Sequence, residues 1–121
     1  MKITTTHIRV NNATELFTEI AAKLTASYAE RGNGRVETDD FEMDGYIWSC
    51  TAIIDTEYKT TEYRDSPPEY EYTMIDVYII EIQCTDKEGG EIDATFFDAN
   101  GREIGDDELV QVVTSLLSDK N

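Results

Sequence analysis

The sequence predicts a single α+β domain over residues 1–121, with an antiparallel sheet of four to six strands and two helices. Two long stretches rich in β-branched and aromatic residues, 46–63 and 70–85, lie on either side of a Pro-Pro pair and predict a long central hairpin. One helical repeat of apolar residues precedes this hairpin, and a second lies near the C-terminus. The predicted order of elements is therefore β-α-β-β-β-β-α, with the first helix packed on one face of the sheet.

The first strand is predicted over residues 2–10, where apolar and polar side chains alternate imperfectly. Asn12 followed by Glu15 resembles a capping box, which would open a helix that runs to about Glu30. The apolar face of this helix consists of Leu16, Phe17, Ile20, Leu24 and Tyr28. Gly32-Asn33-Gly34 predicts the end of the helix, because glycine readily adopts the left-handed conformation.

Turn chemistry divides the rest of the chain. Residues 35–43 form a weak strand, and Asp44-Gly45 predicts a two-residue hairpin turn, because both central positions of such a turn need positive φ. Glu88-Gly89-Gly90 predicts a turn into a strand over 92–97. Asn100-Gly101 predicts a turn into a short return strand.

The last helix is predicted to begin at Asp106-Asp107-Glu108, since carboxylates stabilise the positive N-terminal end of a helix. Its apolar face consists of Leu109, Val112, Val113, Leu116 and Leu117.

The central hairpin, residues 46–85, is predicted to turn about Pro67. In that register the opposed pairs are Ile54 and Ile80, Ala52 and Ile82, and Cys50 and Cys84. The even-numbered residues of both strands, with Trp48, would then share one apolar face under the first helix, because a slip of one residue would move a whole strand's set to the other face. Both cysteines are expected to be reduced core residues, with a disulfide between them as the alternative.

The other face of the hairpin also carries apolar side chains, at Ile47 and at the four positions of a predicted dimer face. That face consists of Ile53, Ile75, Val77 and Ile79. Either the C-terminal helix or a second copy of the chain would cover it. We expect both helices on the even-numbered face and a homodimer contact on the other.

The net charge of −16 arises from 26 acidic and 10 basic residues. Residues 1–64 hold 11 acids and 7 bases, a net charge of −4, whereas residues 65–121 hold 15 acids and 3 bases, a net charge of −12. Direct nucleic-acid binding relies on Lys and Arg at the phosphates, so we expect none, and we expect no binding to anionic membranes. Self-repulsion that maintains solubility is the simplest explanation of the charge, and a basic protein partner is the alternative.

The tip of the hairpin combines tyrosines with carboxylates. The candidate partner-binding residues are Tyr58, Tyr63, Tyr70, Tyr72, Glu69 and Glu71. Cross-strand tyrosine pairs stabilise any sheet. Tyrosine also supplies rigid amphipathic contact area at interfaces, so a protein-binding finger is the alternative interpretation.

Residue types that carry catalysis form no recognisable pattern. His7 is the single histidine and has no acid partner near it in the sequence, and both cysteines are expected to be buried. Residues 98–108 begin like a calcium loop, but Arg102 occupies a ligand position, so a hairpin explains them better. Phosphate loops, nucleophile elbows and zinc spacings are absent from the sequence. We therefore expect no enzymatic activity, no cofactor and no metal site.

Asp76 and Glu81 interrupt otherwise apolar strands. We expect each to lie hydrated at the rim of the buried region, with a carboxylate inside a pocket as the alternative. The first ten residues contain no apolar run that could form a signal-peptide core, and no stretch reaches membrane length, so a cytoplasmic location is expected.

Three functional hypotheses follow from these observations. The first is a small acidic protein-interaction or adaptor domain, which would use the hairpin and its second apolar face. The second is an acidic mimic of nucleic acid that inhibits a DNA-binding or DNA-cleaving protein. The third is a small-ligand-binding or enzymatic domain with a pocket between the sheet and the first helix.

Overall fold

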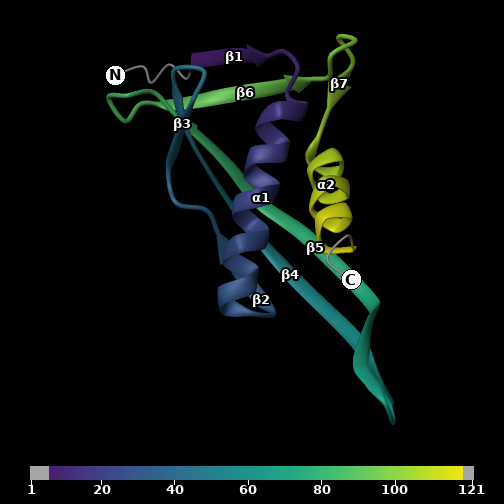
Figure 1. Ribbon diagram of the computed structural model, residues 1–121. Helices are drawn as coiled ribbons and strands as arrows, with labels where there is room; N and C mark the ends of the chain where they lie inside the picture. Colours follow the sequence, from purple (N-terminus) through teal and green to yellow (C-terminus); the bar gives the residue numbers. More distant parts are fainter. Residues whose placement is uncertain (1–5, 119–121) are drawn as a thin grey trace.

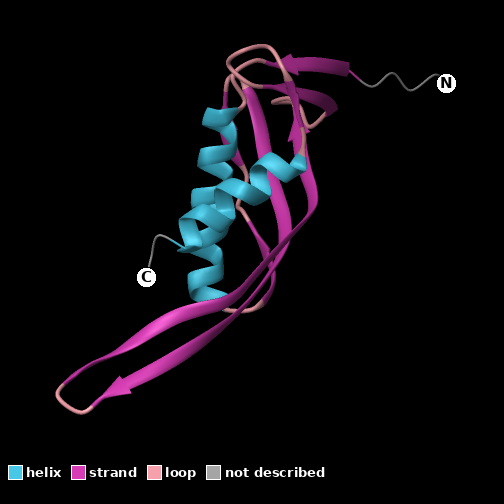
Figure 2. Ribbon diagram, turned by 90° about the vertical axis from the view of Figure 1, so that its right-hand side faces the viewer, coloured by secondary structure: helices cyan, strands magenta, loops and turns pink. Residues whose placement is uncertain are grey.

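Two helices lie on one face of a sheet, and no helix of the described residues covers its other face (Figures 1 and 2). The computed structural model describes residues 6–118, apart from the side chains of Glu69, Tyr70 and Tyr72. In chain order the elements are β1 (Thr6–Val10), α1 (Thr14–Arg31), β2 (Gly34–Glu37), β3 (Phe41–Met43), β4 (Tyr46–Tyr63), β5 (Ser66–Thr85), β6 (Glu91–Phe97), β7 (Glu103–Ile104) and α2 (Asp106–Ser118). The α+β class and both helices are confirmed, and no helix within the described residues is long and apolar enough to cross a membrane.

The sheet has seven strands instead of the four to six predicted, in the order β1-β6-β5-β4-β2, with β3 also paired to β4 and β7 paired to β6. One pair is parallel: β1 lies beside β6, from Thr6 opposite Ile92 to Val10 opposite Phe96. The prediction of an antiparallel sheet is wrong for this pair. The local alternation of side chains does not reveal strand direction, which here depends on segments more than eighty residues apart.

The weak strand predicted over 35–43 is two short strands, β2 and β3, which both pair with β4. Between the two strands, Thr38 forms the hydrogen bonds to β4. Its N–H donates to the carbonyl of Cys50 (2.9 Å), and its hydroxyl accepts from the Cys50 N–H (2.9 Å). The return strand predicted after Asn100-Gly101 is confirmed as β7.

The hydrophobic core lies between the helices and the strands β4 and β5. Its fully buried members include Phe17, Ile20 and Leu24 on α1, and burial of each such side chain stabilises the fold by about 1.5–3 kcal/mol. The Phe17 and Trp48 rings both pack against Phe96, with centroids 5.1 and 6.0 Å away. Helix α2 adds Leu109, Val113 and Leu117, so the core connects both helices to β4, β5 and β6.

Helix α1 begins differently from the prediction. Asn12 has a φ of +53°, and the helix is capped by Ala13 without any side-chain hydrogen bond, so the predicted capping box with Glu15 does not form. The N–H of Ala13 instead donates to the carbonyl of Phe97 in β6 (2.8 Å). The end of the helix is as predicted: Gly32, with a φ of +77°, donates its N–H to the carbonyl of Tyr28.

The loops 86–90 and 98–102 have the same construction. Each loop begins with an aspartate, Asp86 or Asp98. The N–H of this aspartate donates to the carbonyl of the fifth residue of the loop, and its carboxylate accepts hydrogen bonds from the N–H groups of the third and fifth residues, all at 2.7–2.9 Å. The fourth residue is a glycine, with a φ of +89° in the first loop and +82° in the second. Both predicted turns are confirmed, and the carboxylate of Asp98 is engaged by the backbone as a hairpin requires.

The central hairpin is confirmed, but its turn is not at Pro67. Arg64 and Asp65 form a two-residue turn, and the two prolines lie inside β5, where the pairing with β4 is irregular and requires no hydrogen bond from them. The predicted register is therefore wrong by two positions at Cys50 and by three at Ala52 and Ile54, which lie opposite Ile79 and Val77. Cys50 lies opposite Ile82 and Trp48 lies opposite Cys84, so the thiols are not opposed, and both are free.

A β-bulge at Ile80 changes which residues of β5 face the helices. Thr51 pairs with Glu81 and Ala52 pairs with Ile79, so Ile80 is an extra residue in β5. The even-numbered face is confirmed on β4, where Trp48, Cys50, Ala52, Ile54 and Thr56 are all buried. On β5 it is confirmed only from Ile82 onwards; beyond the bulge the odd-numbered residues face the helices.

The base of the hairpin is held by Asn33, just after the end of α1. The amide oxygen of Asn33 accepts the Thr56 N–H and its amide nitrogen donates to the Thr56 carbonyl, each at 3.0 Å, so the side chain substitutes for one residue of a neighbouring strand. The Tyr28 hydroxyl hydrogen-bonds to both Asn33 and the Thr56 hydroxyl. Thr56 is the last buried residue of β4, so this network marks the point where the hairpin leaves the core.

We expect the substitution Asn33→Ala to lower the free energy of unfolding by about 1–3 kcal/mol, because the N–H and carbonyl of Thr56 lose their partners at a partly buried position. Urea denaturation followed by circular dichroism measures this. Asn11→Ala is the control, since Asn11 is exposed and only accepts a hydrogen bond from Arg9. Equal stability of the two variants would show that Asn33 does not fix the hairpin.

Candidate functional site: the open face and arm of the central hairpin

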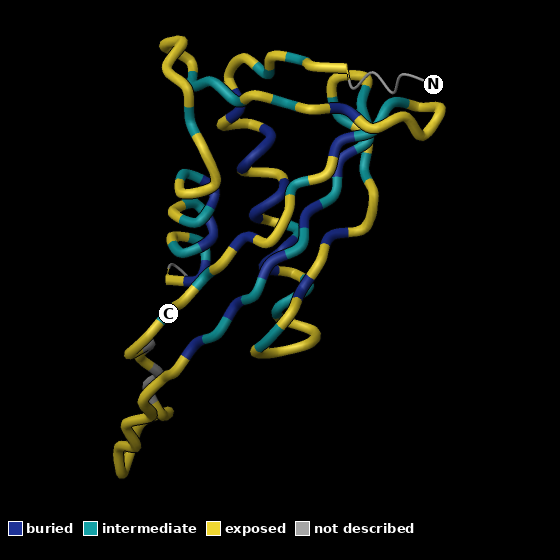
Figure 3. Tube along the Cα trace, turned by 180° about the vertical axis from the view of Figure 1, so that it is seen from behind, coloured by how far each residue is buried: buried dark blue, intermediate teal, exposed yellow. Residues whose placement is uncertain are grey.

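Beyond Thr56 the hairpin continues as a two-stranded arm, which we define as residues 57–74. It extends past the ends of both helices (Figures 1 and 2). Every side chain of the arm that the structure describes is exposed, as the yellow tube in Figure 3 shows. The predicted projection of the hairpin beyond the core is confirmed.

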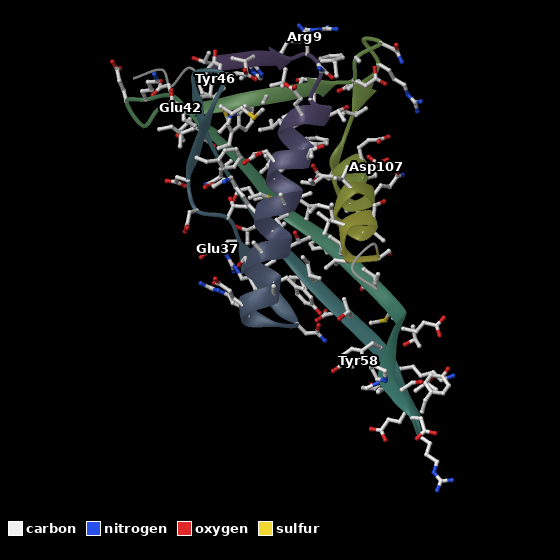
Figure 4. The ribbon with its side chains drawn as sticks, in the orientation of Figure 1. Arg9, Glu37, Glu42, Tyr46, Tyr58 and Asp107 are labelled. Carbon is white, nitrogen blue, oxygen red and sulfur yellow. The ribbon has the colours of Figure 1, made fainter. Side chains whose placement is uncertain are left out.

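The strand pairing of the arm brings together the predicted partner-binding residues. Tyr58 lies opposite Tyr72, position 71 lies opposite Lys59, and positions 69 and 70 lie opposite Thr61 and Thr60. Tyr58 is 60% exposed and lies on the arm, beyond the ends of both helices (Figure 4), and Tyr63, beside the turn, is 50% exposed. The side chains of Glu69, Tyr70 and Tyr72 lie outside the described residues, and their part in binding stays a prediction.

On the side of β4 and β5 that faces away from the helices lies a second group of residues, which we name the open face. It consists of Ile53, Asp55, Met74, Asp76, Tyr78, Ile80 and Glu81. Tyr78 is 65% exposed, and Met74 and Ile80 are about two-fifths exposed, at 41% and 42%. Exposed apolar side chains that cluster on one face are typical of interaction surfaces.

The predicted dimer face is wrong for three of its four residues. Ile79 is buried in the core and Ile75 and Val77 pack against the core, because the bulge turns them towards the helices. Only Ile53 lies on the open face. Whether this chain forms a dimer is a separate matter, which stays a prediction.

Sequence reasoning missed Tyr78 and Ile80 as exposed residues. A signal was present: Ile75, Val77 and Ile79 form an unbroken apolar alternation, whereas Asp76 and Tyr78 are polar at the positions assigned to the core. If the alternation of buried and exposed side chains reverses between residues 79 and 82, the apolar residues of both halves of the strand lie on the same face.

The open face is negatively charged, and two of its carboxylates lie directly opposite each other. Asp55 pairs with Asp76 across the strands, an arrangement that destabilises a sheet by up to about 1 kcal/mol. Glu81 lies on the same face, further along the sheet, opposite Thr51. None of the three belongs to an ion pair within the described part of the chain; the nearest base in the register, Arg35, lies opposite Ile53. The predicted hydration of Asp76 and Glu81 is confirmed, since both are exposed.

His7 has an acid neighbour that the sequence did not reveal. The parallel pairing of β1 with β6 places His7 opposite Asp93, with Nδ1 at 3.7 Å from the carboxylate. Both side chains are mostly exposed, at 74% and 67%. Both thiols of the chain are buried, in contrast to this exposed pair.

Both thiols are held in their neutral form. Burial raises the pKa of Cys50 to about 12, with a further increase from the carboxylate of Asp106, and burial raises the pKa of Cys84 to about 11. A thiol reacts as its thiolate, so neither cysteine is reactive near neutral pH.

The described part of the surface has several hollows. One of about 280 Å³ separates the C-terminal half of α1 from residues 37–39, and it is lined by polar and charged groups such as Lys23, Glu30 and Arg31. Between α1 and the sheet, fully buried side chains such as Ile20 and Ile54 fill the space. Residues 6–118 contain no group of three His, Cys, Asp or Glu side chains arranged to hold a metal ion.

Comparison of this chain with protein-family models, with curated proteins and with solved structures finds no match.

We expect both thiols to resist iodoacetamide in the folded chain at pH 7.5 and to be alkylated in concentrated urea. Because both folded-state pKa values lie above the ordinary value of 9.0, the unfolded chain releases its thiol protons first as the pH rises. Stability is therefore expected to fall between about pH 9 and pH 11, and to fall less in a Cys50→Ala/Cys84→Ala variant. Mass spectrometry and urea denaturation measure the two effects, and rapid alkylation of the folded chain would contradict this account.

Proposed function

We propose that this chain is a protein-interaction domain without catalytic activity, which binds a basic protein partner through the central hairpin. The observation that carries the proposal is the composition of the open face, where Met74, Tyr78 and Ile80 are exposed beside unpaired carboxylates. Apolar and aromatic side chains supply contact area at interfaces, and the surrounding charges set the choice of partner.

The charge of the open face supports a basic partner. Asp55 and Asp76 repel each other across the strands, and a lysine or arginine from another protein would relieve that repulsion while making charge-assisted hydrogen bonds. A second copy of this chain would bring the same carboxylates together, and each copy has a net charge of −16. A different, basic protein is therefore the better-supported partner, and the homodimer ranks below it.

The arm gives the same partner a second contact. Its described side chains are exposed, it carries tyrosines at Tyr58 and Tyr63, and it continues the hairpin that forms the open face. A two-stranded projection of this kind reaches into a groove or around a neighbouring domain at little cost in core stability. The arm thus extends the proposed interface rather than forming a separate one.

The two other hypotheses have less support. The exposed acids of the described residues lie on several surfaces, including α1, the β2–β3 edge, the loop 86–90 and the start of α2, whereas a mimic of nucleic acid would hold them in one continuous band. A pocket protein would need space between α1 and the sheet, which side chains fill. The buried thiols and the exposed His7 support the proposal of a domain without catalytic activity.

The proposal is tested by affinity capture from the native cell at low salt. We expect the variant Asp76→Lys/Glu81→Lys to retain at least about tenfold less of the partner than the wild type, since it reverses the charge of the open face. The matched control Glu30→Lys/Glu88→Lys makes the same change in net charge at exposed residues away from the hairpin, and it should retain the partner. The same proteins captured equally by all three chains would contradict the proposal.

Removal of the arm tests its share of the interface. A chain in which residues 58–72 are replaced by Asn-Gly should keep its free energy of unfolding within about 1 kcal/mol, because the arm buries little side-chain surface. Partner retention should fall, but by less than in the open-face variant. Unfolding of the shortened chain would show that the arm belongs to the core, against the structure described here.

A further inference from the structure

The outer edge of β5 has no strand beside it along most of its length. Pairing with β6 involves only Cys84 and Thr85, after which β6 diverges from β5 to lie along β1 (Figure 1). Within the described residues, no other strand pairs with β5 on this side. Residues 66–83 of β5 therefore form a free sheet edge, and such an edge is a template for another chain.

The hydrogen bonds of β4 show which backbone groups point to this free edge. Cys50 and Thr56 each direct both N–H and C=O away from β5, to Thr38 and Asn33 respectively. Because backbone groups alternate along a strand, Ala52 and Ile54 do the same. In an antiparallel pair, opposed residues point their backbone groups either both inward or both outward.

Three consecutive odd-numbered residues of β5 lie opposite β4 residues whose backbone groups point away from β5. They are Ile75, Val77 and Ile79, opposite Thr56, Ile54 and Ala52. Their N–H and C=O groups therefore point to the free edge, three donors and three acceptors, while their side chains pack towards the helices.

The free edge is protected at both ends but not in the middle. The bulges at Thr73 and Ile80 interrupt the ladder, and Pro67 and Pro68 lie at the far end of the strand; bulges and prolines are the usual means of preventing edge pairing. Between the bulges lie the six regularly paired residues 74–79, a length of about 20 Å. We propose that this stretch of β5 binds an extended segment of the basic partner, antiparallel to β5, as an added strand of the sheet.

The two faces of the sheet determine the side chains that such a segment carries. Residues opposite Ile75, Val77 and Ile79 lie on the helix-covered side, where α2 packs along β5, and so are apolar (Figure 1). Residues opposite Asp76 and Tyr78 lie on the open face, beside the unpaired carboxylates, and so are basic. The segment alternates apolar and basic residues. This inference rests on the proposed function and adds the mode of binding and the chemistry of the bound segment.

A second copy of the chain does not fit the edge. Antiparallel self-pairing about Val77 would place each Asp76 opposite Tyr78 of the second copy and diagonal to its Asp76, and each Asp76 already lies opposite an Asp55. Like charges on adjacent strands are destabilising, and the two copies have a net charge of −16 each.

The test uses the full chain and a fluorescent, acetylated heptapeptide of alternating lysine and valine. In the proposed antiparallel arrangement the valines, opposite the odd-numbered residues, exchange backbone hydrogen bonds with β5, whereas the N–H groups of the lysines point away. We expect N-methylation of the valines to weaken binding at least about tenfold, and the matched N-methylation of the lysines to leave it within about twofold. A glutamate–valine peptide of the same length should bind at least about tenfold more weakly. Equal binding of the two methylated peptides, or stronger loss with methylated lysines, would overturn the proposal.

A pair of variants at one position tests the edge in the chain itself. Val77→Pro removes an N–H group that points to the free edge. Val77→Ala keeps this N–H group but leaves a smaller side chain than proline does. We expect the alanine variant to bind the peptide and the proline variant to lose at least about tenfold in affinity. If Val77→Pro does not fold, as judged by circular dichroism, the methylated peptides decide the matter.

The same variants separate this inference from the proposed function. Retention of the native partner by Val77→Pro, together with its loss in Asp76→Lys/Glu81→Lys, would overturn the added strand and leave the open face as the binding surface. Retention by both variants would overturn both proposals. A stable dimer of the wild type that Val77→Pro converts to monomer would replace the partner segment by a second copy.

Discussion

The extra residue Ile80 in β5 is the constraint on which the arrangement of the hairpin depends. On one side of it, Ile82 and Cys84 face the helices; on the other, Ile79 and Val77 do so. Without the bulge the alternation along β5 would turn Tyr78 into the core and expose the aliphatic side chains of Ile75, Val77 and Ile79. With it, both halves of a long strand bury their aliphatic residues under the helices, and the polar residues of the second half lie on the face that nothing covers.

The two edges of the central hairpin differ in their hydrogen bonding. Helix α2 packs on β5 and α1, while β6 diverges to pair with β1, so the central hairpin is covered on one face and is unpaired along its β5 edge. On the β4 side, Asn33 and Thr38 satisfy the backbone groups of Thr56 and Cys50 with side-chain and main-chain atoms. Up to Thr56, the β4 edge of the hairpin is therefore paired, whereas most of the β5 edge is free. The proposed binding of a basic protein would use the exposed apolar strip, the unpaired carboxylates and the free edge, which all involve β5.

Local sequence signals predicted much of this fold, whereas they did not predict which distant segments pair. Gly32 as the end of α1 and the turn at Asp44 were predictable, because only a few residue types adopt positive φ easily. The hairpin turn was not, since Arg64-Asp65 is a weaker turn signal than the adjacent Pro-Pro pair. The parallel pairing that places His7 beside Asp93 depends on segments at opposite ends of the chain. Of the candidate site, the sequence indicated the exposed tyrosines and the acidic half. It assigned the apolar residues of β5 to the wrong face because one continuous alternation was assumed through Ile80, where the bulge reverses it.

Amide hydrogen exchange along β5, measured by NMR on the free chain, reports which backbone groups of this strand point to the free edge. The account predicts that the N–H groups of Ile75, Val77 and Ile79, which point to the free edge, exchange rapidly, and that those of Asp76 and Tyr78, bonded to β4, are protected. The reverse alternation would place the bulge elsewhere and return the odd-numbered residues to the open face. Uniform protection of all five would mean that the edge of β5 is already paired, and the binding mode proposed for it would be contradicted.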